Sequence, residues 1–363
     1  MRFRPTVAEI DLEAIRHNVR ALKPPASELM AVVKADGYGH GDVAVARAAL
    51  EAGATWLGVA LVEEGLRLRD AGIEDPILVL SEAPPGSEGD ALAAGLTPTC
   101  YTDDGLRGLA GAGPGSALHV KVDTGMHRVG LSPERSVGFC EAVGRLGLQI
   151  GGVWTHFARS EELGDPTTDE QLKRFEEVLA ALEAAGHRPR YRHAANSGAT
   201  IVRPEAHFDL VRVGIGMYGI LPGPQLEGAV DLRPAMTLRS RVSMVRRLPA
   251  GEAISYGHRY RLERESTIAT VPIGYADGYM RALSNVGRVL IGGRRHPVAG
   301  TVTMDHLMVD CGDHLVRPGD EVVLLGRQGD QEIRAEEVAE WAGTIGYEVV
   351  TSVSARVPRV HRG

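Results

Sequence analysis

The chain has 363 residues, 44% hydrophobic and 24% charged, so it can bury a full core and should be an ordinary globular protein. This length favours two domains over one. A net charge of −7 argues against nucleic acid or an anionic membrane as a general partner, and no run approaches the ~18 apolar residues of a transmembrane helix.

Two further features bear on the compartment. The N-terminal segment Met1–Asp11 lacks the unbroken apolar region of a signal peptide. Cys100, Cys140 and Cys311 are an odd number at wide spacing, which predicts neither a disulfide framework nor a metal site. We therefore expect a cytoplasmic protein without a bound metal.

Between residues 28 and 220, short β-branched apolar runs alternate with helical stretches. The expected strands are Leu29–Val33, Trp56–Leu61, Ile77–Leu80, Leu96–Tyr101, Leu118–Val122, Ile150–Phe157, Tyr191–Ala195 and Phe208–Ile215. Eight strands separated by helices are the pattern of a (β/α)₈ barrel.

Within this region, the helical spacing of Leu172, Phe175, Leu179 and Leu182 predicts a helix that ends near Gly186. By contrast, the segment Gly105–Ser116 is rich in glycine and alanine and is expected to be a loop.

After Gly223 the pattern changes to strand-like runs broken by glycines. Gly292–Gly293 predicts a hairpin turn between Val289–Ile291 and His296–Ala299. One short helix is expected from Ala335 to Trp341. The predicted fold is therefore α/β, with a (β/α)₈ barrel at residues 1–234 and a mainly β domain at residues 235–363. Roughly the first 10 residues are expected to pair with the β domain.

Lysine is scarce in this chain: only Lys23, Lys34, Lys121 and Lys173 are present among 40 basic residues. Lys34 lies at the end of an apolar strand, before the glycine-rich turn of Val33–Gly41, and active sites of barrels lie at that C-terminal rim. Because a lysine amine can lose its proton and form a Schiff base, Lys34 is a candidate to bind a pyridoxal cofactor. A salt bridge to Asp36 is the structural alternative.

Residues after strands seven and eight predict a phosphate site on the same rim. Gly214 and Gly216 follow Arg212 and allow a phosphate to approach the main chain, while Ser197 offers a hydroxyl donor. Either glycine could also serve only to turn the chain.

Strands five and six add further candidates at this rim. Lys121 and Arg128 belong to the segment Lys121–Gly130, and His156 ends strand six. An isolated histidine is more often an interior structural residue, but its place at the same rim as Lys34 and Arg212 favours a functional role.

In the second domain, tyrosines lie beside glycines in Ile254–Gly257 and Val271–Gly278, and Thr301–Asp305 carries an acidic residue. From the residues alone, these segments are best interpreted as turns of the β domain.

Together these segments resemble the alanine racemases, pyridoxal-phosphate enzymes that combine a (β/α)₈ barrel with a C-terminal β domain. The resemblance extends from Ala8–Leu12 to Arg356–Arg359, and its most specific motifs are Val33–Gly41, Lys121–Gly130 and Ser255–Gly257. It implies an isomerase that interconverts L-alanine and D-alanine and supplies D-alanine for peptidoglycan. It also implies a homodimer with shared active sites.

The resemblance implies that Lys34 holds pyridoxal 5′-phosphate as an internal aldimine. The other residues implied to bind the cofactor are Tyr38, His156, Asn196, Ser197, Arg212, Gly214 and Ile215. Arg212 is implied to face the pyridine nitrogen, which stays unprotonated because an arginine does not hand over its proton. This weakens the cofactor as an electron sink and disfavours transamination.

Two bases are implied because racemisation takes the α-proton from one face of a planar intermediate and returns it to the other. Lys34 is implied to serve D-alanine, and Tyr256 of the partner subunit to serve L-alanine. A tyrosine, with an ordinary pKa of about 10, needs help to act as a base at neutral pH. His156 and Arg212 are the expected network that stabilises the phenolate.

Other roles also follow from the resemblance. Arg128 is implied to orient the substrate carboxylate, held in place by a carbamate on Lys121. Met304 and Asp305 are implied to reach the partner's site. Tyr275 and Arg281 are implied to line its entrance.

Two positions differ from the common pattern of the family. This chain has Ala355 where many relatives have a tyrosine, and Thr301 where many have an arginine. The first change would widen the inner gate and the second would remove a charge from the entry path. Racemisation is unaffected, but strict specificity for alanine is less well supported.

Three alternatives remain. A racemase of broader scope that accepts serine has the same fold. A decarboxylase is disfavoured because such relatives place an acidic residue near the pyridine nitrogen, where this chain has Arg212. A non-catalytic pyridoxal-phosphate carrier would lack both the β domain and a counterpart of Tyr256.

Overall fold

The computed structural model describes residues 4–363, so Met1, Arg2 and Phe3 of the expected N-terminal segment lie outside the described residues. The contacts divide the chain into two compact units. Of the described residues, one unit contains 15–37 and 42–233, and the other contains 4–14, 38–41 and 234–363. They are called the barrel unit and the C-terminal unit below.

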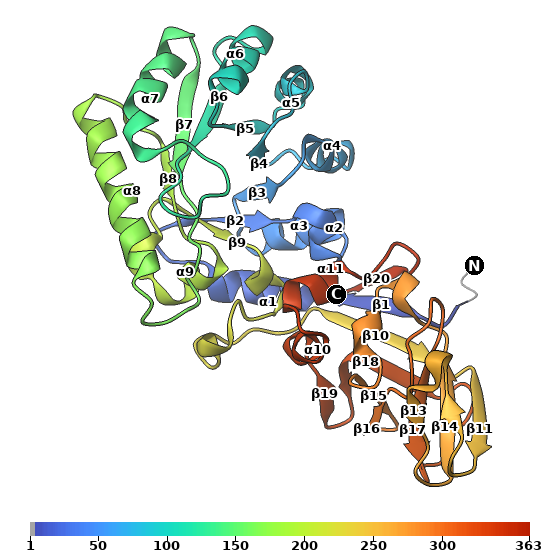
Figure 1. Cartoon of the computed structure of the whole chain (residues 1–363). Helices are drawn as coiled ribbons and strands as arrows, with labels where there is room; N and C mark the ends of the chain where they lie inside the picture. The colour runs from blue at the N-terminus through green and yellow to red at the C-terminus, as the bar shows by residue number, and fades with distance from the viewer. Residues whose placement is uncertain (1–3) are drawn as a thin grey trace. The chain divides into compact units, whose positions relative to one another are not determined.

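The barrel unit is built on eight parallel strands in the order β8-β7-β6-β5-β4-β3-β2-β9 (Figure 1). These strands are β2 (Glu28–Val32), β3 (Trp56–Val59), β4 (Ile77–Glu82), β5 (Thr97–Cys100), β6 (Ala117–Lys121), β7 (Gln149–Trp154), β8 (Tyr191–His193) and β9 (Leu210–Val213). All eight predicted strands are confirmed. Hydrogen bonds from Asp209 to Arg192 (3.1 Å) and from Arg212 to Ala195 (3.0 Å) join β9 to the β8 side, so the barrel is nearly closed.

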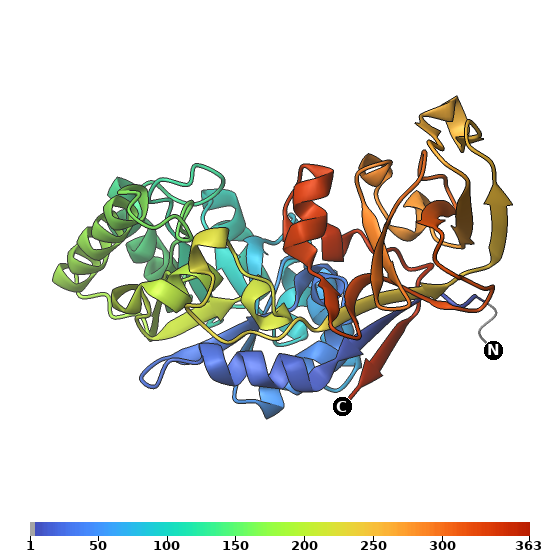
Figure 2. The same ribbon diagram turned by 90° about the horizontal axis from the view of Figure 1, so that it is seen from below.

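Helices follow the strands and lie on the outside of the barrel, as Figures 1 and 2 show. They are α3 (Asp42–Glu51), α4 (Val62–Asp70), α5 (Glu88–Ala93), α6 (Asp103–Ala112), α7 (Ser136–Arg145), α8 (Thr167–Ala184) and α9 (Ser197–Val202), with α1 (Leu12–Leu22) before the first barrel strand. The predicted helix around Phe175 is α8, and Gly186 follows its end with a positive φ of 85°. A positive φ favours glycine there.

The expectation of a loop at Gly105–Ser116 is wrong, because α6 occupies most of that segment. Thr102 caps the helix by accepting a hydrogen bond from the Gly105 amide at 3.0 Å. Leu106 and Leu109 are one helical turn apart, and both are buried. This buried stripe outweighs the weak helix propensity of the glycines.

The connection after β2 has an unusual backbone. Ala35, Asp36, Gly37 and Tyr38 all have φ between 51° and 59°, which makes the short element α2 (Lys34–Tyr38) a left-handed turn. A left-handed conformation costs a residue other than glycine roughly 1–2 kcal/mol. Such strain persists only where the surrounding structure enforces it.

The C-terminal unit contains a seven-stranded sheet in the order β16-β15-β18-β10-β1-β20, with β19 also paired to β18. Its strands are β1 (Val7–Asp11), β10 (Met236–Arg241), β15 (Arg288–Ile291), β16 (Arg294–Pro297), β18 (Glu321–Gln328), β19 (Gln331–Ile333) and β20 (Arg359–Arg362). β1 is antiparallel to β10 and parallel to β20, so both ends of the chain join this sheet.

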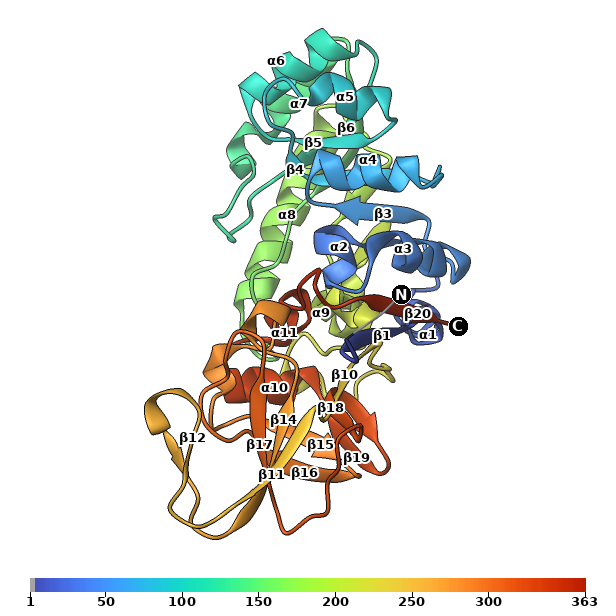
Figure 3. The same ribbon diagram turned by 90° about the vertical axis from the view of Figure 1, so that its right-hand side faces the viewer.

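A second sheet of this unit consists of β11 (Met244–Leu248), β14 (Ser266–Val271) and β17 (Leu307–Gly312), which lie side by side in Figure 3. The short strands β12 (Ala253–Ile254) and β13 (Tyr260–Arg261) form a separate pair. The predicted hairpin is confirmed, since Ile291 pairs with Arg294 across Gly292 and Gly293.

The predicted helix near Ala335 is α10 (Ala335–Ala342). A further helix, α11 (Gly346–Thr351), was not predicted; it is only six residues long. Among residues 4–363, no helix combines the length and the apolar character needed to cross a membrane.

Candidate active site

Lys34 follows β2 and is half-buried. Burial lowers the pKa of its amine, the positive charge of Arg128 lowers it further, and Glu64 opposes both. A salt bridge to Asp36 is not among the ion pairs of residues 4–363; Asp36 instead accepts a hydrogen bond from the Asp42 amide at 3.3 Å. Lys34 therefore has an amine that loses its proton more readily than an exposed lysine.

Arg212 lies inside the barrel, at β9, and is only 3% exposed. Its guanidinium donates to the carbonyls of Thr155 (2.7 Å) and Ala194 (2.9 Å) and contacts Nδ1 of His156 (3.2 Å) and of His193 (3.0 Å). No carboxylate is paired with it among the described ion pairs. Burial lowers its pKa to about 9, so the group stays cationic at neutral pH.

The two histidines beside Arg212 are neutral, because burial and then the charge of Arg212 lower their pKa values. A guanidinium can only donate, so Nδ1 of His156 and Nδ1 of His193 must accept, and each ring carries its proton on Nε2. Nε2 of His193 then faces Nδ1 of His119 at 3.0 Å. A directed chain of hydrogen bonds thus runs from Arg212 into the barrel interior.

Lys121 ends β6 and is 4% exposed, with Nζ 4.4 Å from the centre of the Trp154 ring. Burial, together with the charges of Arg128 and Arg212, lowers its pKa to about 7. The adjacent loop is folded by Asp123, whose carboxylate accepts the amides of Gly125, Met126 and His127, each at 3.0 Å. That loop carries Arg128, which is exposed.

Lys121→Met is expected to stabilise the protein at acidic pH. Between pH 7 and the ordinary value of 10.5, the unfolded state binds more protons at this position than the folded state, so stability rises with pH across that window. Below it, the buried charge destabilises the fold. We expect Lys121→Met to raise the free energy of unfolding by on the order of 3 kcal/mol at about pH 6, and by less as the pH approaches about 9.5.

This prediction is checked by urea unfolding in buffers free of carbon dioxide. Lys173→Met, at an exposed position of α8, is the control and should change little at either pH. If Lys121→Met raises the free energy of unfolding by the same amount at both pH values, Lys121 is not a buried amine with a lowered pKa.

Ser197 connects α9 to the segment after β9. Its Oγ accepts the amides of Gly214 (3.0 Å) and Gly216 (3.3 Å), so its own hydrogen remains available to donate. Ile215, between the two glycines, is buried and begins a short 3₁₀ turn. Asn196 caps α9 by accepting from Ala199 at 3.1 Å, and Ser160 donates to it at 2.6 Å.

The barrel unit therefore brings together most of the residues predicted for it. The charges of Arg212, Arg128, Lys121 and Lys34, in that order, all lower the pKa of His156, so these five groups interact with one another. Ser197, Gly214 and Ile215 follow the same ends of β8 and β9.

The remaining predicted residues belong to the C-terminal unit. Tyr256 begins a 3₁₀ turn, is 76% exposed and lines a cavity of about 570 Å³ with His258, Thr303 and Met308, among others. The flanking Ser255, Gly257 and His258 have positive φ angles of 64°, 73° and 49°. This turn presents the phenol of Tyr256 outward.

The other predicted residues of this unit lie on two connected turns and near the chain end. The Tyr275 amide donates to the Thr303 carbonyl at 3.0 Å, next to Met304, and Arg356 donates to Asp305 at 2.7 Å. Tyr275 and Met304 are 42% and 52% exposed. Three more of the residues named above belong to this unit. The Tyr38 ring lies 6.3 Å from the Tyr347 ring. Arg281 begins a short 3₁₀ turn, and Ala355 is exposed.

Thr301, one of the two unusual positions, supports the turn of Tyr256. Its Oγ1 donates to the Tyr256 carbonyl at 2.8 Å, and its own carbonyl accepts from Ser255 at 2.7 Å. Thr301→Val removes the first bond and should lower the free energy of unfolding by about 1 kcal/mol. Thr301→Ser retains the hydroxyl and should be less affected; equal losses in thermal or urea unfolding would contradict this role.

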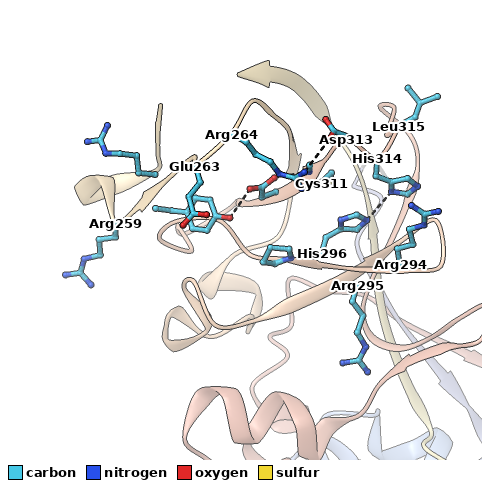
Figure 4. A pocket seen from close by; sticks show the side chains of 15 residues that line it. Arg259, Glu263, Arg264, Arg294, Arg295, His296, Cys311, Asp313, His314 and Leu315 are labelled. Atoms are coloured by element: carbon cyan, nitrogen blue, oxygen red, sulfur yellow. Dashed lines mark hydrogen bonds and ion pairs between the residues drawn. The ribbon is translucent and has the colours of Figure 1, made fainter. Parts of the chain in front are cut away.

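A separate cavity of about 1120 Å³ lies in the C-terminal unit (Figure 4). His296 and His314 stack there, with nitrogens 3.1 Å apart, and Arg264 pairs with Asp313. None of the predicted catalytic or cofactor-binding residues lines this cavity. Within the described residues there is also no group of three or more His, Cys, Asp or Glu placed to hold a metal ion.

Sequence reasoning missed several residues that support the site. Gln171 of α8 donates to the His156 carbonyl (3.1 Å) and accepts from the Ala158 amide (2.9 Å), which fixes the segment after β7. His119 and His193 continue the hydrogen-bond chain from Arg212. The inward alternation along β6 and β8 could have indicated both histidines, but no local signal indicates Gln171.

These features define a (β/α)₈-barrel enzyme with a half-buried lysine of lowered pKa after its first barrel strand. Two family models match the chain: "Alanine racemase, N-terminal domain" over residues 10–222 and "Alanine racemase, C-terminal domain" over residues 235–361. An alanine racemase of Symbiobacterium thermophilum is 52% identical over 378 residues, which cover 99% of this chain and 98% of that protein.

Solved structures agree with this. The alanine racemase of D-cycloserine-producing Streptomyces lavendulae has a TM-score of 0.95 and 43% identity, covering 100% of this chain and 98% of that one. The enzyme of Bacillus anthracis with bound L-Ala-P has a TM-score of 0.95 and 40% identity, covering 100% and 96%. The chain belongs to the alanine racemase family, and it is an isomerase.

Proposed function

We propose that this enzyme interconverts L-alanine and D-alanine with pyridoxal 5′-phosphate and two bases, Lys34 and Tyr256. The observation that carries the proposal is the presence, in the barrel unit, of a lysine of lowered pKa, Lys34, and a buried arginine, Arg212, for which residues 4–363 supply no carboxylate partner. The bound L-Ala-P of the Bacillus anthracis relative supports a small alanine-like substrate.

The residues of the barrel unit fit the proposed cofactor. The guanidinium of Arg212 is a buried cation that needs an electron-rich neighbour, and a pyridine nitrogen can accept from it. Ser197 can donate to a phosphate, with the amides of Gly214 and Ile215 as further donors. Tyr38, which belongs to the C-terminal unit, is proposed as a further hydroxyl donor. Asn196 holds the start of α9 in place. When bound through Lys34, pyridoxal phosphate withdraws electrons from the α-carbon of an amino acid.

Arg212 would keep its own proton throughout. Its pKa, although lowered to about 9, lies above neutral pH, and its two terminal NH₂ groups bond to two carbonyls and two neutral histidines. A protonated aspartate at this position could pass a proton onward, whereas Arg212 only donates a hydrogen bond. This favours return of the proton to the α-carbon, hence racemisation.

Lys34 would move the α-proton on one face of the substrate. Burial and the charge of Arg128 increase the neutral fraction of its amine, which is the form that accepts a proton. Tyr256 of a second copy would act on the other face, helped by His156 and Arg212. Met304 and Asp305 would approach that site, with Tyr275 and Arg281 at its entrance.

A homodimer is part of this proposal. Tyr256, Tyr275 and Met304 of the C-terminal unit are 76%, 42% and 52% exposed in the single chain. Exposed aromatic and apolar side chains of this kind favour a surface that a second copy covers. No nucleic acid or membrane enters the proposed activity.

Lys121 is proposed to carry a carbamate. As an ammonium it would be repelled by Arg128 and Arg212, whose charges lower its pKa. A neutral amine can add carbon dioxide through a new N–C bond and release one proton to solvent, and the resulting carbamate anion would attract Arg128 instead. Arg128, so fixed, would bind the substrate carboxylate.

The enzyme is proposed to supply D-alanine for peptidoglycan in the cytoplasm. Its three cysteines are buried and unpaired, which suits a reducing compartment.

Substrate scope is tested by comparing kcat/KM for L-alanine and L-serine. The proposal expects a clear preference for alanine, since a hydroxymethyl group must displace or desolvate more of the site than a methyl group. Comparable values would favour the broader alternative, a racemase of both alanine and serine. That alternative is suggested by Thr301 and Ala355, which differ from the residues common in the family at the entry path and the gate.

A further inference from the structure

The left-handed turn of Ala35–Tyr38 directly follows the reactive lysine. Ala35, its first residue, is exposed and has φ 53° and ψ 52°. Within the turn, the Gly37 amide donates to the Val33 carbonyl at 2.9 Å. The direction of the Lys34 side chain depends on this backbone, so whatever holds the turn also places the amine.

Glu64 of α4 contacts the beginning of this turn. Its Oε1 accepts the Ala35 amide at 2.7 Å, while Oε2 accepts the amides of Ala60 at 2.7 Å and Leu61 at 3.1 Å. One carboxylate therefore joins the segment after β2 to the segment after β3. These three amides lie outside the regular hydrogen bonds of the strands and helices.

We propose that Glu64 is a positioning residue for Lys34, because its carboxylate holds the left-handed turn that begins at Ala35. The proposal rests on the function assigned to Lys34 above. Glu64 does not touch the substrate or the cofactor in this scheme and acts only through the lysine.

A role limited to helix capping does not account for the contact with Ala35. The bond to Leu61 is the ordinary one between the third residue of a helix and its N-terminal residue. Oε1, however, points away from α4 to a separate segment, and Leu61 itself offers no capping side chain. The acidic neighbour Glu63 is exposed and has no such contact.

Glu64 also supplies the negative charge that Lys34 faces. The Lys34 amine interacts electrostatically with Arg128, Lys121, His156 and Glu64, and Glu64 is the carboxylate of this group. Burial and Arg128 lower the pKa of Lys34, and Glu64 limits this fall. Removing the charge should therefore lower the pKa of Lys34 further.

Glu64→Gln tests the proposal, with Glu63→Gln as the matched control on the same helix. A glutamine has one carbonyl oxygen, so it cannot accept all three amides and must present its NH₂ group to at least one of them. We expect amide exchange at Ala35 to be about tenfold faster in the variant. Hydrogen exchange of the full-length protein, followed by mass spectrometry or NMR, measures this.

The second readout is the pKa of the Lys34 amine itself. It is measured from the pH dependence of acetylation in the full chain after the cofactor is removed, with Lys23 as internal reference. We expect Glu64→Gln to lower this pKa, and Glu63→Gln to leave it unchanged.

Unchanged exchange at Ala35 or an unchanged pKa of Lys34 in Glu64→Gln would overturn the proposal. Fast exchange of the Ala35 amide hydrogen in the wild-type protein would also overturn the proposal. Both readouts are independent of turnover, so a protein that binds no pyridoxal phosphate would defeat the proposed function while leaving this test intact.

Discussion

Lys34→Ala is expected to abolish racemisation, with kcat/KM reduced by about 10⁴-fold or more. The variant loses both the amine that attaches the cofactor and one of the two bases. Pyridoxal phosphate should then be removed by dialysis, whereas the wild-type protein should retain its visible absorbance. Chiral chromatography of the alanine product and the absorbance spectrum measure the two losses.

Lys173→Ala is the control, since this lysine is exposed on α8 and should be replaceable without loss. A Lys34→Ala protein that keeps the cofactor after dialysis and still racemises alanine would contradict the role of Lys34. A wild-type protein without the visible absorbance would contradict the cofactor proposal.

Tyr256→Phe should slow the removal of the α-proton, and it should do so unequally for L-alanine and D-alanine. Removal of the α-proton from L-alanine should slow by about 10³-fold, because the base on that face is lost. Removal from D-alanine should fall far less, since Lys34 remains. Exchange of the α-proton with deuterated solvent, followed by NMR for each enantiomer, separates the two rates.

Tyr260→Phe, in the neighbouring strand β13, removes a phenol that donates to Asp310 at 2.9 Å and serves as the control. It should leave both exchange rates near those of the wild-type protein. Equal losses for L-alanine and D-alanine in Tyr256→Phe would argue against a base that acts on one face only.

The barrel could be predicted because its strands carry a local signal. Runs such as Leu29–Val33 and Ile77–Leu80 are apolar on both faces, as buried parallel strands must be, and polar or charged residues mark their ends. The expectation of a loop at Gly105–Ser116 is wrong, because the many glycines suggested a loop while Leu106 and Leu109 form the buried face of helix α6. The six-residue helix α11 is too short for a periodic pattern.

Individual site residues were predictable where chemistry restricts the residue type. Lys34, Lys121 and Arg212 were such candidates, and the structure confirms their positions at or next to strand ends, while their roles stay predictions. Glu64 and Gln171 were not, because each acts through bonds to the backbone of a distant segment, which no sequence pattern specifies. The left-handed turn after Lys34 is similarly a tertiary feature, since Ala35 and Asp36 would not adopt it on their own.

The most direct test of the account is the fate of alanine in deuterated water with the purified protein and pyridoxal phosphate. Starting from either enantiomer, we expect equal final amounts of L-alanine and D-alanine, with deuterium at the α-carbon of the product. Unchanged L-alanine, or conversion to pyruvate or ethylamine in its place, would contradict it.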